Sequence, residues 1–151
     1  MLGRLWLGPN GRVLSANADD HGFFLFVVTH GERVIFHGAN PFLSDRLNVP
    51  DGVNMMANTS VLALSLPFAP VTHFFGAGVT VAVLLTLGLS GTATAWYWVL
   101  SRHLVRGPLA AWIGGLWCGF CPALVAHANG QVNFVSQFVV PFLAWQVLRL
   151  R

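Results

Sequence analysis

The stretch GAGVTVAVLLTLGLSGTATAWYWVL, residues 76–100, decides the fold class of this chain. It contains no formal charge, and about 20 apolar residues in a helix are enough to cross the hydrocarbon core of a bilayer. Its many small residues suit close contacts between helices. Trp96, Tyr97 and Trp98 suit the aromatic belt at a bilayer surface. The stretch therefore predicts a transmembrane helix over about 74–100.

Three other apolar stretches complete the predicted membrane region. A second span is predicted over about 108–126, with Pro108 at its start, where proline costs a helix little. A polar break, HANGQVN at 127–133, separates it from a third predicted span over about 134–150. Residues 60–71 are too few to cross a bilayer and predict a short interfacial or re-entrant helix. The sequence thus predicts an all-α membrane protein with about three transmembrane helices.

Composition supports this class and excludes others. The chain is 55% hydrophobic and 9% charged, with a mean hydropathy of +0.65, whereas soluble domains carry about 25% charged residues. No acidic residue follows Asp51, and all eight basic residues are arginines without a basic stripe. We therefore expect no nucleic-acid partner.

The polar N-terminal region predicts one amphipathic helix within a loop segment. Residues 1–21 are rich in turn formers and predict irregular structure. Asp20 is a candidate cap for a helix that begins near His21 and ends at Asn40-Pro41. Its apolar residues recur at helical spacing, although the run FFLFVV also fits a buried strand.

Charges near the span ends predict the orientation. The arginines next to the predicted spans are Arg102, Arg106, Arg149 and Arg151. Positive charge favours the cytoplasmic side, so both arginine pairs are predicted there. Residues 73–151 then form a multi-pass region in the cell membrane, and residues 1–72 lie outside the cytoplasm. Four N-terminal arginines oppose this orientation, but five acidic residues offset them.

Asp19 and Asp20 are the candidate catalytic residues. A carboxylate beside a membrane surface can act as a general base when partial burial raises its pKa toward neutrality. The competing interpretation is a helix cap with a solvated neighbour.

Polar residues elsewhere are candidates for substrate binding. The guanidinium of Arg46 can hold a phosphate through two hydrogen bonds, and Asp45 or Asp51 could hold a divalent metal that neutralises a diphosphate. A local ion pair and an Asp-Gly turn are the competing interpretation. His127 and Asn129, in the polar break, could contact a headgroup or sugar hydroxyls, or simply form a turn.

Cys118 and Cys121 form a CxxC pattern inside the second predicted span. A thioredoxin-type redox site needs a preceding strand and a surrounding βαβ unit, which the flanking apolar sequence does not predict. We interpret both cysteines as small packing residues, with a membrane thiol relay as the alternative.

Several segments resemble a group of actinobacterial polytopic membrane proteins. The resemblance rests on HGANPFLSDRLNVPDGVNMMANTSVLALSLPFAPVTHFFG, on LLTLGLSGTATAWYWVLSRHLVR and on GFCPALVAHANGQVNF, and it covers about residues 15–151. That group resembles the GT-C glycosyltransferases, which use polyprenyl-phosphate-linked sugars as donors.

The resemblance implies sugar transfer from a lipid-phosphate carrier to an acceptor on the outer face. An acidic residue in the first outer loop would be the base, which corresponds by order to Asp20 or Asp19. Arg46 would contact the phosphate, and His127 would lie in the same outer cavity. GT-C proteins have more helices than this chain and one before the acidic loop, so the chain is expected to be an N-proximal fragment without full activity. The alternative is a non-catalytic small membrane protein, either an assembly factor or an inactive remnant.

Overall fold

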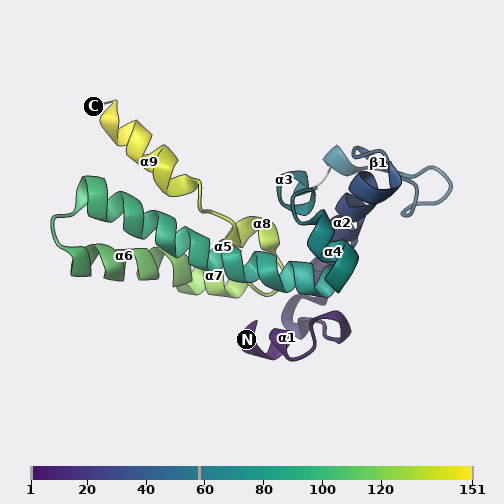
Figure 1. Ribbon diagram of the computed structural model, residues 1–151, viewed down its shortest axis with the longest axis horizontal. Coiled ribbons are helices and arrows are strands. Elements are labelled where there is room, and N and C mark those ends of the chain that lie inside the picture. The colour runs from purple at the N-terminus through teal and green to yellow at the C-terminus, as the bar shows by residue number, and fades with distance from the viewer. Residues whose placement is uncertain (1, 58, 151) are drawn as a thin grey trace. The chain divides into compact units, whose positions relative to one another are not determined.

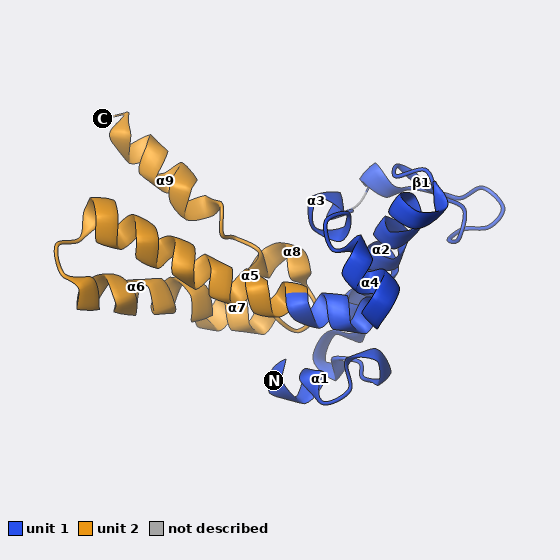
Figure 2. Cartoon of the chain, in the orientation of Figure 1, with its two compact units in different colours: residues 1–83 blue, residues 84–151 orange. Residues whose placement is uncertain are grey.

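The computed structural model describes residues 2–57 and 59–150, and it is mostly helical with one very small sheet (Figure 1). The chain divides into two compact units, Met1–Val83 and Leu84–Arg151 (Figure 2). The boundary lies inside the long helix α5 (Ala77–Val99), which contributes to both units.

Unit 1 begins with short helical turns. These are α1 (Leu2–Trp6), η1 (Pro9–Gly11) and η2 (Ser15–Asn17). The prediction of irregular structure over residues 1–21 is therefore wrong where these turns form. Leu5 of α1 is almost fully buried, so its burial helps to hold α1 against the rest of unit 1.

The central helix of unit 1 is α2 (Ala18–His37). The predicted amphipathic helix is confirmed, and the alternative strand over FFLFVV is wrong. Asn17 occupies the cap position and Asp20 lies inside the first turn, so the prediction of Asp20 as the cap is also wrong. The helix ends at Gly38 rather than at Asn40-Pro41. Gly38 adopts φ 65°, a left-handed conformation that glycine reaches without strain and that commonly ends helices.

Two short helices pack against α2. A two-stranded antiparallel hairpin, β1 (Leu43–Ser44) and β2 (Val53–Asn54), is followed by η3 (Met55–Ala57). The chain then forms α3 (Leu62–Ser65) and α4 (Ala69–Phe75), both of which contact α2. Residues 60–71 are partly helical, but they contribute to two helices, α3 and α4, rather than to the one short helix that was predicted. The interfacial or re-entrant position stays a prediction.

The N-terminal segment of unit 1 caps the start of α5. The Asn10 side-chain oxygen accepts hydrogen bonds from the backbone N–H groups of Gly78 at 3.0 Å and Val79 at 3.3 Å. Its Nδ2 donates to the carbonyl of Phe75 at 2.8 Å. The Asn10 side chain, distant in sequence, thus pairs two of the backbone N–H groups that the start of every helix leaves without a helical partner.

Unit 2 contains the end of α5 and the remaining helices. A π-helical turn, Leu100–Leu104, extends α5. The other elements are α6 (Pro108–Phe120), α7 (Pro122–His127), α8 (Val132–Val135) and α9 (Val140–Arg149). Cys121 is extended between α6 and α7, because the proline that follows cannot continue the helical hydrogen bonds.

Two stretches are long and apolar enough to cross a membrane within the described residues. They are Ala77–Leu104 and Pro108–His127, which match the first two predicted spans. In unit 2 they pack through glycines. A Cβ on Gly119 would lie 2.4 Å from the Ala93 Cβ, and one on Gly115 would lie 2.8 Å from the Ala93 carbonyl oxygen. Glycine is therefore required for this close approach of the two helices.

The third predicted span, over about 134–150, is wrong as a single helix. The chain leaves the helical conformation between α8 and α9, and the ten residues of α9 extend only about 15 Å. The Thr92 hydroxyl of α5 donates to the carbonyl of Val135 at 3.1 Å and accepts from the backbone N–H of Gln137 at 3.1 Å. Pro141 then removes a helical donor and disfavours helix in the preceding turn.

Candidate functional site

Unit 1 holds a polar cavity of about 270 Å³ between the C-terminal half of α2 and the start of the hairpin. The polar side chains that line it are His30, Arg33, His37, Asn40, Ser44, Asp45 and Arg46. The cavity is close to the lower limit of typical ligand sites, which is about 300 Å³. It therefore suits a small polar group rather than a whole large substrate.

The charge of this cavity is positive. Arg33 and Arg46 each bring a guanidinium, and Asp45 brings the one carboxylate of the lining. Within residues 2–57 and 59–150, neither arginine forms an ion pair with a carboxylate. Two guanidiniums without acidic partners at one small cavity form an arrangement that binds phosphate or carboxylate groups.

His30 provides a buried polar atom at the same cavity. The residue is 4% exposed, and its Nε2 has no hydrogen-bond partner among the described residues. Its ring stacks on Phe26 of the same helix, with 6.3 Å between the ring centroids. A buried polar atom without a partner is costly, so a ligand oxygen that reaches this nitrogen would gain binding energy.

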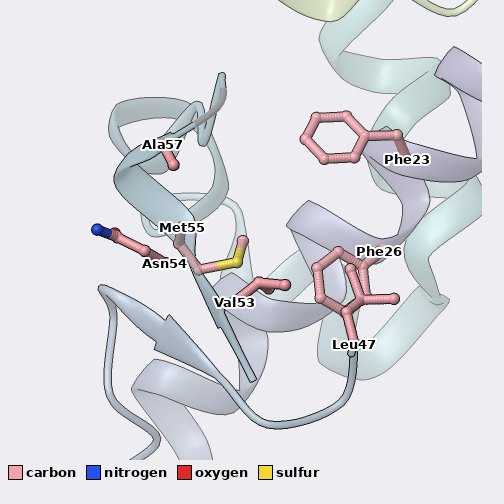
Figure 3. Close-up of a pocket in the computed structure, with 7 residues that line it drawn as sticks. All are labelled: Phe23, Phe26, Leu47, Val53, Asn54, Met55 and Ala57. Carbon is pink, nitrogen blue, oxygen red and sulfur yellow. The ribbon is translucent and has the colours of Figure 1, made fainter. Parts of the chain in front are cut away.

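Unit 1 also holds an apolar cavity of about 320 Å³ (Figure 3). Phe23 and Phe26 of α2 lie on one side of it, and Val53 and Met55 lie on the other. Residues of α2 and of the hairpin segment line both cavities. Phe26 lines the apolar cavity one helical turn before His30, and Leu47 lines it directly after Arg46.

The Glu32 carboxylate of α2 contacts two histidines. Its Oε1 lies 2.8 Å from His73 Nδ1 of α4 and 3.5 Å from His37 Nε2, and its side chain is 12% exposed. The His73 ring stacks on Phe36 at 4.3 Å between centroids. His37 also lines the polar cavity, so this cluster borders the cavity wall.

Sequence reasoning missed this cluster. Glu32 and His73 are 41 residues apart and belong to different helices, so only tertiary packing brings them together. The sequence did contain one local signal, because Glu32 and Phe36 are four residues apart and lie on the same face of a helix.

The predicted base lies far from the polar cavity. Asp19 is exposed, and Asp20 is partly buried and accepts a hydrogen bond from Asn17 Nδ2 at 2.6 Å. Both occupy the first turn of α2. Arg33 follows Asp20 by thirteen residues on the same helix, which is about 20 Å along its axis. The structure therefore does not bring Asp19 or Asp20 to the predicted phosphate contact.

The predicted binding residues separate into three places. Asp45 and Arg46 line the polar cavity, as their prediction requires, whereas Asp51 is exposed before the Gly52 turn and does not line it. His127 and Asn129 belong to unit 2. His127 Nδ1 hydrogen-bonds the side chain of Gln131, and Asn129 Nδ2 donates to the carbonyl of Ala126 at 3.0 Å, as expected of a turn.

His21 is a second buried histidine, and its hydrogen bond connects two segments of unit 1. It is fully buried, and its Nδ1 accepts a hydrogen bond from the backbone N–H of Leu14 at 3.1 Å. Burial lowers the pKa of His21 because the charged imidazolium would lose its hydration. The neutral ring therefore ties the N-terminal turns to α2.

The described part of the chain contains no group of three or more His, Cys, Asp or Glu side chains that could hold a metal ion. Comparison with known proteins finds no family model, no curated protein and no solved structure that matches this chain.

Proposed function

We propose that this chain is part of a membrane glycosyltransferase that binds a lipid-linked phosphate and transfers its sugar to an acceptor on the outer face. The observation that supports the proposal best is the pair of cavities in unit 1, whose lining residues are close neighbours along the chain. One is polar and positively charged, and the other is lined almost entirely by apolar side chains.

The polar cavity suits the phosphate of such a donor. Arg33 and Arg46 can each donate two parallel hydrogen bonds to phosphate oxygens, and neither spends this capacity on an acidic residue of the described chain. His30 Nε2 adds a buried group that lacks a partner. A phosphate would satisfy all three groups together.

The apolar cavity suits the first part of a lipid chain. Phe23, Phe26 and Met55 line it, and burial of a methylene group contributes about 0.8 kcal/mol. The two apolar stretches long enough to cross a membrane, Ala77–Leu104 and Pro108–His127, support a location at a bilayer, where a lipid carrier is found. In this proposal, Arg102 and Arg106 lie on the cytoplasmic side, and residues 1–72 lie outside the cytoplasm.

The experiment that tests this proposal is binding of decyl phosphate to the whole chain in detergent micelles, measured by calorimetry. Arg33→Gln and Arg46→Gln should each weaken binding about tenfold or more, because a hydrogen bond to a charged group contributes about 1.5–3 kcal/mol. Arg102→Gln, outside unit 1, is the matched control and should bind normally. Equal binding of decyl alcohol, or equal loss in all three variants, would contradict the proposal.

The rival proposal is a non-catalytic membrane protein that associates through the small residues of 76–100. In unit 2 these residues already have partners within the chain: Gly88 faces Val135 and Ala93 faces Gly119. Their use in contacts within one chain favours the first proposal. A stable oligomer in mild detergent that does not bind decyl phosphate would instead favour the rival.

A further inference from the structure

We infer that the Glu32–His73 pair, rather than Asp19 or Asp20, is the proton acceptor of the transfer reaction. This inference rests on the proposed function, because it needs a donor phosphate in the polar cavity. It adds to that function the group that activates the acceptor hydroxyl.

The geometry of the pair is that of an oriented base. His73 Nδ1 lies 2.8 Å from Glu32 Oε1, and an ionised carboxylate can only accept a hydrogen bond. The proton of a neutral His73 ring is therefore on Nδ1, and its Nε2 keeps a lone pair. Phe36, stacked at 4.3 Å, fixes the plane of the ring. A carboxylate that orients an imidazole in this way also stabilises the imidazolium that forms when Nε2 takes a proton.

Burial separates the roles of the two side chains. The Glu32 side chain is 12% exposed, whereas the His73 side chain is 39% exposed. The carboxylate is thus held inside the unit, and the imidazole remains accessible to an acceptor molecule. A buried carboxylate behind a reachable imidazole is the order in which a proton relay needs these groups.

The position of the pair favours it over the N-terminal aspartates. Arg33 follows Glu32 directly, and His37 lies 3.5 Å from the Glu32 carboxylate while it also lines the polar cavity. Asp20 is about 20 Å from Arg33 along α2. A general base must reach the reacting hydroxyl directly or through one water, and the Glu32–His73 pair lies closer to Arg33 than Asp19 or Asp20 does, because Glu32 precedes Arg33 in α2 and contacts His37 of the cavity lining.

The step that follows conserves atoms and charge. The acceptor hydroxyl transfers its proton to His73 Nε2, and its oxygen forms a bond to the anomeric carbon of the donor sugar. The bond between that carbon and the phosphate oxygen breaks, and the lipid phosphate leaves with the electron pair. It gains one negative charge, which Arg33 and Arg46 would stabilise. The imidazolium beside Glu32 later releases its proton to water.

The main competing interpretation is a structural contact between α2 and α4. His73→Asn separates the two roles, because its side-chain amide can still donate to Glu32 but cannot serve as the base. Glu32→Gln tests the carboxylate, and His103→Ala in unit 2 is the matched histidine control. Circular dichroism and decyl phosphate binding show whether each variant is folded and keeps its cavity.

The test uses the whole chain in vesicles with a radiolabelled polyprenyl-phosphate hexose as donor and measures both transfer and decyl phosphate binding. We expect His73→Asn and Glu32→Gln to bind decyl phosphate within about twofold of the parent chain and to lose transfer by about a hundredfold or more. Nitrogen NMR of the imidazoles should show His73 protonated on Nδ1 in the parent chain, and this signal should change in Glu32→Gln.

The outcomes distinguish the inference from the proposed function. Normal transfer by His73→Asn and Glu32→Gln would overturn the inference alone, and so would loss of transfer only in Asp20→Asn. An unchanged His73 nitrogen signal in Glu32→Gln would overturn the assignment of the base, even where this chain alone binds decyl phosphate without transfer. Absence of binding by the parent chain would overturn the proposed function and this inference with it.

Discussion

Gly119→Ala perturbs the closest contact between the two candidate membrane helices. The added Cβ would lie 2.4 Å from the Cβ of Ala93 and 2.6 Å from both its Cα and its nitrogen. Because two of these atoms belong to the backbone, no side-chain rotation relieves the contact. The helices would have to separate by about 1 Å, given that 3.4 Å is the start of ordinary contact.

The expected change in the free energy of unfolding of Gly119→Ala is the difference between two opposing effects. Insertion of a methyl group into a packed contact costs about 1–3 kcal/mol, and replacement of glycine by alanine inside a helix returns up to about 1 kcal/mol. We expect Gly119→Ala to lower the free energy of unfolding by about 1–2 kcal/mol. Gly114→Ala is the control, because its Cβ would meet only a methyl group of the flexible Leu100 side chain.

The assay is unfolding of the chain in mild detergent by added denaturing detergent, followed by circular dichroism. Gly114→Ala should be as stable as the parent chain or slightly more so, and Gly119→Ala should unfold earlier. Addition of Ala93→Gly should restore only part of the loss, since the Cα and nitrogen of residue 93 remain. If Gly119→Ala equals or exceeds Gly114→Ala in stability, the packing of these helices is not as described.

Two further predictions concern the polar contacts of each unit. The lowered pKa of buried His21 should make unit 1 lose stability as pH falls below about 6.5, because the unfolded histidine takes up a proton before the folded one does. In unfolding measurements between neutral and mildly acidic pH, His21→Gln should flatten this dependence of stability on pH. An unchanged slope in His21→Gln would exclude His21 as the source of the dependence. Thr92→Val removes both hydrogen bonds to the segment between α8 and α9 and should lower the free energy of unfolding by about 1–3 kcal/mol. Amide exchange at Gln137 should accelerate in this variant, and unchanged exchange would contradict the role of Thr92.

The sequence predicts best what local composition controls. The long uncharged run at 76–100 and the apolar run from Pro108 correspond to the two stretches that are long enough to cross a membrane. The third span is not a single helix: Thr92 binds the chain at Val135 and Gln137 through long-range contacts that hydropathy cannot detect, and Pro141 disfavours helix in the preceding turn. Hydropathy therefore identified the apolar segments but not where α8 and α9 separate.

In the candidate site, too, the sequence predicts residues that are neighbours along the chain but not residues that tertiary packing brings together. Asp45 and Arg46 were predicted as neighbours in a polar loop, and they do line one cavity. Arg33 lies within the predicted amphipathic helix, and nothing in the sequence indicates that the hairpin returns to it. Glu32 and His73 likewise become a pair only after α4 has packed on α2.

The cap that Asn10 provides for α5 constrains the order of events during synthesis. Asn10 emerges from the ribosome 68 residues before Gly78, its hydrogen-bond partner. At a translation rate of about 5–20 residues per second, this side chain waits roughly 3–14 s for its partner. Unit 1 therefore cannot be completed before the start of α5, the first candidate membrane helix, has been made. The polar unit would finish folding at the time when that helix becomes available for insertion into a bilayer.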